Sequence, residues 1–274
     1  MNVLIFVFIF LLGVMIGSFL NVVIYRLNSG KSIVRGRSIC MTCNKELRWF
    51  ELIPLFSFLI QNGKCRRCAI KISHQYPIVE FLTGLVFVLI AYRFLPVMDI
   101  SSGTYIFLIF LYVYIFSLLI VISIYDLRHK IIPDKLVYLF ILISFLSIFI
   151  NTSFITSSSI FVLPSISLLI AGPVLAIPFA ALWYFSKGRL MGLGDGKLIL
   201  GLGWLLGLSA GLFSLVISFW LGTIVGLTLI FLSKKKMNMK TEIPFAPFLI
   251  ICAFITFLFN FNFYSLIKFF SLDL

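Results

Sequence analysis

Long runs of apolar residues, separated by shorter polar segments, dominate this sequence. Each run approaches the ~20 residues that an α-helix needs to cross the hydrocarbon core of a bilayer, and we count about eight of them. A segment in lipid must satisfy its own backbone hydrogen bonds, so the runs are expected to be helices. They cover Val3–Tyr25, Pro77–Leu95, Thr104–Tyr125, Leu136–Ile150, Ile160–Phe185, Leu198–Leu208, Gly211–Leu232 and Pro244–Phe270, the sixth being short.

The composition supports a membrane protein. Hydrophobic residues make up 62% of the 274 residues, and charged residues only 11%. A soluble domain of this composition would lack the polar side chains needed to cover its surface. We therefore predict an all-α polytopic membrane protein.

The basic residues lie on one side of the predicted spans. Ten occur in 26–71, three in 128–135, three in 187–197 and four in 234–240, which is 20 of the 22 in the chain. These gaps alternate along the chain, so the positive-inside rule makes this side cytoplasmic and puts both termini outside. The net charge of +13 reflects this topology and does not indicate a nucleic-acid partner, because no compact basic module exists. The basic residues follow the first run, which favours a retained anchor over a cleaved signal peptide.

Two C-x-x-C motifs occur in the first cytoplasmic loop, with a spacing close to that of a four-cysteine zinc ribbon. Four thiolates close a tetrahedral zinc site without an open position, so a structural role is favoured over a catalytic one. A redox function and unmetallated thiols are the alternatives, while disulfides do not fit a cytosolic loop. The motifs consist of Cys40, Cys43, Cys65 and Cys68.

The sequence thus divides into three parts. Residues 1–25 form the first transmembrane helix, 26–76 the cytoplasmic tetracysteine domain, and 77–274 a transmembrane helical domain. Between the cysteine motifs, Trp49–Ile60 is apolar but too short to span a bilayer, and Pro54 interrupts it. This segment is expected to pack on the cysteine domain or to lie against the membrane surface.

Two aspartates are candidates for chemistry. Asp126 ends the third span and Asp195 begins the sixth, which places both near the cytoplasmic face. Two carboxyl groups that meet form an aspartic dyad, in which one stays protonated while the other activates water. An ion pair with Arg128 or Lys130 is the alternative role of Asp126, and a helix cap is that of Asp195.

The surroundings of the two aspartates lead to further expectations. Glycines in Met191–Lys197 would permit a bend and close approach of helices. The helix dipoles favour the anion at Asp195, which opens a helix, and the protonated acid at Asp126, which ends one. Asp134 is expected to cap the next helix.

Motifs along most of the chain resemble those of the type IV prepilin peptidases, also called leader peptidase/N-methyltransferases. They comprise Gly17-Ser-Phe-Leu-Asn-Val-Val-Ile-Tyr-Arg26, both cysteine motifs, Tyr76-Pro-Ile-Val-Glu80, Asp126 with Ile132-Pro-Asp134, and Gly192-Leu-Gly-Asp-Gly-Lys197.

The resemblance implies a specific activity. Such enzymes are aspartic endopeptidases of the bacterial cytoplasmic (inner) membrane that remove the leader of type IV prepilins and pseudopilins at the cytoplasmic face. The resemblance implies that Asp126 and Asp195 are the catalytic pair. It also implies N-methylation of the new N-terminus with S-adenosylmethionine. No G-x-G-x-x-G motif marks a methyl-donor site, and Glu80 is either a candidate for it or a buried polar contact.

Three other functions remain open. The first alternative is a peptidase without methyltransferase activity. The second is a proton-coupled transporter that uses the two aspartates as a relay. The third is a zinc-ribbon scaffold without catalytic activity. The partners expected under the main prediction are prepilins or pseudopilins and membrane lipid.

Overall fold

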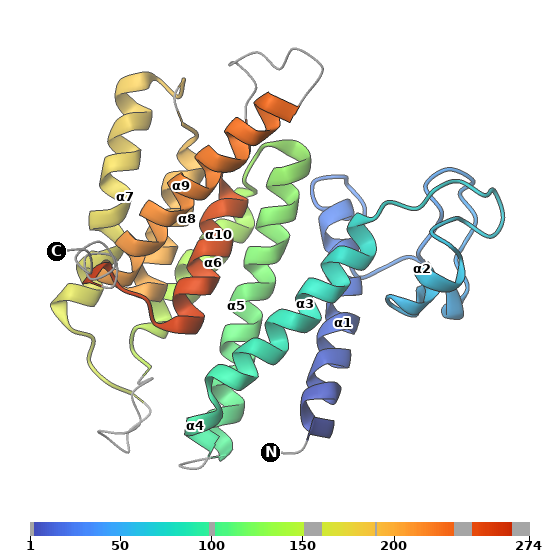
Figure 1. Cartoon of the computed structure of the whole chain (residues 1–274), viewed down its shortest axis with the longest axis horizontal. Helices are drawn as coiled ribbons and strands as arrows, with labels where there is room; N and C mark the ends of the chain where they lie inside the picture. The colour runs from blue at the N-terminus through green and yellow to red at the C-terminus, as the bar shows by residue number, and fades with distance from the viewer. Residues whose placement is uncertain (1–2, 99–101, 151–160, 190, 233–242, 265–274) are drawn as a thin grey trace. The chain divides into compact units, whose positions relative to one another are not determined.

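The computed structural model describes residues 3–98, 102–150, 161–189, 191–232 and 243–264. These residues form helices joined by turns and loops (Figure 1). The chain divides into two compact units, Met1–Val121 and Ile122–Leu274. Helix α5 (Ser102–His129) contributes residues to both units.

The first unit is built on two long helices that pack side by side, α1 (Val3–Arg26) and α3 (Gln75–Arg93). Glycines on α1 allow this close approach. A Cβ at Gly13 would lie 2.8 Å from the Cα of Gly84, and one at Gly17 would lie 2.8 Å from the Cα of Glu80. Between the two helices, the chain forms the tetracysteine loop.

Short helices complete the first unit. The 3-10 helix η1 (Trp49–Leu52) and α2 (Phe56–Ile60) lie in the tetracysteine loop, and α4 (Leu95–Met98) follows α3. Figure 1 shows the loop to one side of α1 and α3.

The second unit is centred on α8 (Leu193–Leu206), which contacts four other helices. A Cβ at Gly203 of α8 would lie 2.7 Å from the Cα of Gly172, so only small residues permit this backbone approach. The neighbours of α8 are α6 (Asp134–Ser147), α7 (Ile166–Ser186), α9 (Leu208–Leu232) and α10 (Ala246–Phe259).

Each of the eight apolar runs contains a helix, which confirms the all-helical class. Five helices, namely α1, α3, α5, α7 and α9, are long and apolar enough to cross a membrane. The other three, α6, α8 and α10, have 14 residues each, or about 21 Å of helix, which is shorter than a hydrocarbon core of about 30 Å. The described residues thus contain five candidate membrane-spanning helices, and the count of eight spans stays a prediction.

Several predicted boundaries differ from the structure. Helix α5 extends to His129 rather than Tyr125, and α8 begins at Leu193 rather than Leu198. Helix α7 begins at Ile166 rather than Ile160, since 161–165 are not helical and contain Pro164. Helix α10 ends at Phe259 because Asn260 takes a left-handed conformation with φ of 53° and turns the chain. Residues 151–160, 265–270 and the lysine cluster in 234–240 lie outside the described ranges.

Candidate functional site

Asp126 lies in the last turn of α5 and is buried, with 4% of its surface exposed. Helix α5 ends three residues later, where the Lys130 N–H donates to the Asp126 carbonyl over 2.7 Å and Lys130 takes a φ of 54°. The carboxylate is thus fixed at the end of a rigid helix. Its Oδ2 atom is buried and has no hydrogen-bonding partner among the described residues.

Asp195 lies in the first turn of α8, where Gly192 is the N-cap in an extended conformation. It is half-buried, and the charge of Asp126 acts on it directly. The structure therefore brings the two aspartates predicted from sequence together within the second unit, although they are 69 positions apart in the chain.

Gly194 permits this arrangement by leaving space. A Cβ at Gly194 would lie 3.0 Å from the Cβ of Ile132, which follows α5 in the chain. The expected close approach thus occurs at this glycine. The expected bend does not depend on glycine conformation, because no glycine in 192–196 has a positive φ.

A third helix meets the pair. The backbone N–H of Ala246, at the start of α10, is a hydrogen-bonding partner of Asp126. The N-terminus of a helix favours a nearby anion. Asp126 therefore lies at the C-terminus of α5 and also meets the N-terminus of α10, so the two dipoles oppose each other there, and the predicted division into an anionic Asp195 and an acidic Asp126 stays a prediction. Sequence could not supply this contact, because Ala246 is 120 positions away from Asp126.

Asp134 has a different role from the predicted helix cap. Pro133 is the N-cap residue of α6, and the carboxylate of Asp134 accepts a hydrogen bond from Lys197 Nζ over 2.6 Å. The same ammonium group lies 4.8 Å from the centroid of the Tyr138 ring. The pair links α6 to α8 next to Asp195. In the sequence, the only indication of this ion pair was a lysine two positions after Asp195.

The four predicted metal-binding cysteines also come together, in the first unit. All four sulfur atoms lie within 4.8 Å of one another, so one ion can reach them all. Neighbouring thiols at this distance repel one another when ionised, and a divalent cation relieves that repulsion. The residues present fit a tetrahedral metal site.

The two cysteine motifs fold in the same way, 25 positions apart. In the first, the N–H of Cys40 donates to Lys45 O and that of Asn44 to Cys40 O; in the second, the N–H of Cys65 donates to Ile70 O and that of Ala69 to Cys65 O. Asn44 and Ala69 take equivalent left-handed conformations, with φ of 53° and 56°.

Backbone groups prepare the first motif for a cation. Hydrogen bonds from the backbone of Cys43 and then Thr42 lower the pKa of the Cys40 thiol to about 7. A lowered pKa favours the thiolate, which is the form that binds metal. The structure therefore supports a metal-binding cluster, while the identity of the ion is a proposal.

Glu80 forms the buried polar contact that was one of its two predicted roles. Its side chain is 6% exposed, and its Oε2 accepts a hydrogen bond from the Leu55 N–H over 2.8 Å. The contact joins α3 to the tetracysteine loop. Whether Glu80 also serves a methyl donor stays a prediction.

The described helices and these two clusters define a class: a helical protein with five candidate membrane spans, a pair of interacting carboxyl groups and a four-cysteine cluster. Two family models match the chain. Residues 11–94, with the cysteines, match the bacterial peptidase A24 N-terminal domain, and residues 113–227, with both aspartates, match the type IV leader peptidase family.

Curated relatives extend the match to most of the chain. A protein of Aeromonas salmonicida is 30% identical over 92% of this chain and 90% of its own length. One of Bacillus subtilis is 29% identical over 87% and 88%, and one of Myxococcus xanthus is 42% identical over 46% and 35%. Each is named prepilin leader peptidase/N-methyltransferase. No solved structure matches significantly. The chain belongs to the type IV leader peptidase family.

Proposed function

We propose that this chain is a membrane aspartic endopeptidase that removes the leader peptide of type IV prepilins, with Asp126 and Asp195 as its catalytic pair. Membership of the leader peptidase family makes it a peptidase for such substrates. The observation that supports the site is the electrostatic interaction of the two carboxyl groups, which come from the end of α5 and the start of α8.

The two aspartates would divide acid and base chemistry. One carboxylate accepts a proton from water, which attacks the carbonyl carbon of the scissile peptide bond. The other carboxyl group, in its protonated form, donates a hydrogen bond to the carbonyl oxygen and later a proton reaches the leaving amine. Because the groups act on each other, they titrate as a pair rather than as separate acids.

The position of the aspartates suits a substrate that lies in the same membrane. We place the site at the cytoplasmic face of the bacterial inner membrane, from the distribution of basic residues. A prepilin helix in that membrane would present its leader on this side, at the depth of Asp126 and Asp195. Positioning of this kind lowers the entropic cost of bringing the bond to the catalytic groups.

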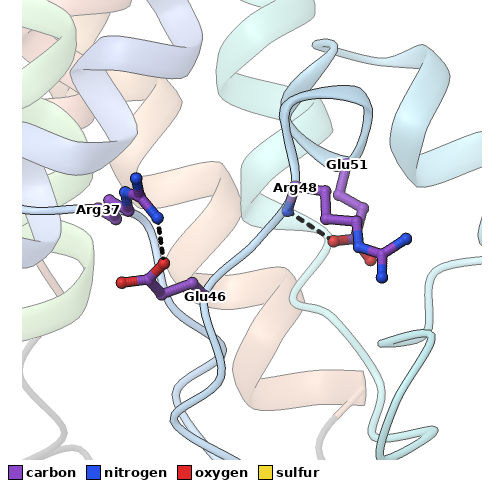
Figure 2. Close-up of polar contacts among 4 residues, drawn as sticks. All are labelled: Arg37, Glu46, Arg48 and Glu51. Carbon is purple, nitrogen blue, oxygen red and sulfur yellow. Dashed lines mark hydrogen bonds and ion pairs between the residues drawn. The ribbon is translucent and has the colours of Figure 1, made fainter.

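The acidic residues of the tetracysteine loop do not provide a free receptor for a basic leader. Figure 2 shows that Glu46 accepts a hydrogen bond from Arg37 and that Glu51 accepts one from the Arg48 N–H, at 2.6 and 2.8 Å. Each carboxylate keeps further acceptor sites, but its charge is already shared with a basic neighbour or a backbone N–H, which weakens its attraction for a basic leader.

A second activity is included in the proposal. The names of the relatives contain N-methyltransferase, and we infer that this chain methylates the new N-terminus with S-adenosylmethionine. The cysteine cluster would hold zinc in a structural role, because four protein sulfurs leave no position open for substrate. Zinc would fix the fold of a loop that has little core of its own.

Leader cleavage in membranes tests the catalytic assignment. A prepilin is co-expressed with the wild-type chain, with Asp126→Asn or with Asp195→Asn, and the processed fraction is measured by its shift in mass. Cleavage should be lost in both variants. Asp134→Asn is the matched control, since its carboxylate is 64% exposed in the same unit, and it should retain cleavage. A transporter or a scaffold would leave cleavage equal in all variants.

A further inference from the structure

The segment Trp49–Ile60 of the tetracysteine loop exposes large apolar side chains. Trp49 is 77% exposed, and the exposed face of α2 carries Phe56, Leu59 and Ile60 at 59, 68 and 67%. A loop in water would bury side chains of this size, and a contiguous exposed set marks a binding surface. We call this set the apolar ridge.

The apolar ridge lies beside the first turns of a candidate membrane span. The N–H of Leu55, the residue before α2, donates to Glu80. Glu80 is the sixth residue of α3, so it lies about 7.5 Å along the helix axis from its first residue. Since α3 is long and apolar enough to span a bilayer, α2 lies beside the first turns of a span rather than beyond its end, as Figure 1 shows.

Positive charge surrounds the apolar ridge. The loop region 26–76 carries ten basic side chains and two acidic ones, and both acidic groups already accept hydrogen bonds within the loop (Figure 2). The guanidinium groups of Arg48 and Arg66 lie 6.0 and 5.1 Å from the centroid of the Phe50 ring. The Phe50 ring lies 5.8 Å from that of Trp49, so the two arginines border one end of the ridge, and both are exposed.

We propose that the apolar ridge inserts into the interfacial region of the bilayer, and that Arg48 and Arg66 bind the phosphates of anionic phospholipids. A short element with an aromatic and aliphatic face bordered by basic groups is suited to this position. The occupant is the lipid surface rather than a second protein, because the contact with Glu80 holds α2 beside α3, a candidate span that exposes the apolar side chains of Ile78 and Phe81 at 52 and 49%. The proposal does not depend on the peptidase function.

Fluorescence in nanodiscs tests the insertion. The full chain is reconstituted in nanodiscs with phosphatidylglycerol and phospholipids brominated near the headgroup, which quench nearby tryptophans. The difference between the wild type and Trp49→Phe gives the emission of Trp49. Leu59→Trp in the Trp49→Phe background is the second probe. Val34→Trp in that background is the matched control, since Val34 belongs to the same loop and is 87% exposed.

Bromine should quench Trp49 and the tryptophan introduced by Leu59→Trp, and it should leave the one from Val34→Trp bright. Aqueous acrylamide should show the reverse order. Quenching of the ridge probes by acrylamide to the level of the control would overturn the proposal. Shielding of these probes from both quenchers would also overturn it, because a protein surface would then cover the ridge.

The arginines are tested by lipid composition. An arginine near an anionic surface contributes about 1 kcal/mol, or roughly a fivefold change in the ratio of inserted to free segment. Arg48→Gln and Arg66→Gln should each lower bromine quenching of Trp49, and exchange of phosphatidylglycerol for phosphatidylcholine should do the same in the wild type. Equal quenching in both lipids would contradict the anionic specificity. Metal content, measured in parallel, shows that the cysteine cluster remains folded.

Discussion

At the residue scale, the proposed chemistry depends on how Asp126 is held at the end of α5 and Asp195 at the start of α8. Asp126 and Asp195 each stand at a boundary between an apolar run and a basic gap, and the alternation of gaps predicts that they lie on one side of the membrane. The Ala246 N–H at Asp126 and the Lys197–Asp134 pair come from tertiary contacts. Such contacts have no local signal in the chain.

One strained residue offers a test of the second cysteine motif. Ala69 has a φ of 56°, a conformation that costs an L-residue with a Cβ about 1–2 kcal/mol. Glycine relieves this strain but loses more backbone entropy on folding than alanine does. The net effect of Ala69→Gly should be to stabilise the motif by about 1 kcal/mol. The rate of metal release to a chelator should fall.

The first motif supplies the control for that test. Asn44 takes the equivalent conformation with φ of 53°, and Asn tolerates it better than Ala. Asn44→Gly should change the release rate less than Ala69→Gly. A faster release from the Ala69→Gly protein would show that the strain is absent.

At the scale of elements, each of the eight predicted apolar runs contains a helix, but some helix ends and the short helices η1, α2 and α4 were not predicted. Periodic or continuous apolar character marks the interior of a helix, whereas the end of α10 depends on the left-handed Asn260 and the start of α7 on the non-helical residues around Pro164. The central position of α8 was also not predicted. Its sequence contains glycines, but it does not indicate which helices pack against them.

Because α7 and α8 pack closely, adding one methyl group at Gly203 should lower the stability of the protein. A Cβ at Gly203 would lie 2.7 Å from the Cα and 3.0 Å from the N of Gly172, and backbone atoms cannot move aside as a side chain can. Gly203→Ala should destabilise the protein by about 1–3 kcal/mol, seen as a lower Tm in detergent.

Gly222→Ala on α9 is the control for this substitution. A Cβ there would make an ordinary contact of 3.5 Å with Phe248, and its higher helix propensity should leave the Tm equal or raise it. Equal Tm values for Gly203→Ala and the wild type would contradict the packing described for α7 and α8.

The cysteine cluster should act as one structural element. Cys40→Ser combined with Cys65→Ser should remove the bound metal, because each motif loses a ligand. The loop should then become sensitive to protease, since metal binding supplies much of its folding free energy. Atomic emission of the purified protein gives the metal content, and limited proteolysis reports the loop. Unchanged metal content in the double variant would contradict the assignment.

At the scale of the whole molecule, sequence predicted the membrane class and the family but not the division into two compact units within α5. That division depends on which helices pack together, and apolar runs of similar character do not specify their neighbours. Three of the eight helices are shorter than a full span, so the number of crossings needs a direct measurement.

Reporter fusions to the C-terminus of the full chain measure that number. With about eight crossings and an external N-terminus, the C-terminus lies outside. A C-terminal alkaline phosphatase should be active, and a C-terminal green fluorescent protein should be dark. A fusion of each reporter after Lys71, in the tetracysteine loop, should give the opposite pattern. A fluorescent C-terminal fusion would mean that one of the short helices does not cross the bilayer.

The central claim is that Asp126 and Asp195 act as one catalytic unit, and the kinetics of purified enzyme test it most directly. Leader removal from a purified prepilin is measured with the wild type, Asp126→Asn, Asp195→Asn and the double variant in one lipid mixture. Residues that act as a unit give non-additive losses, so each single variant should lose as much kcat as the double variant. Substantial cleavage by either single variant, or a further large loss in the double variant, would contradict the account.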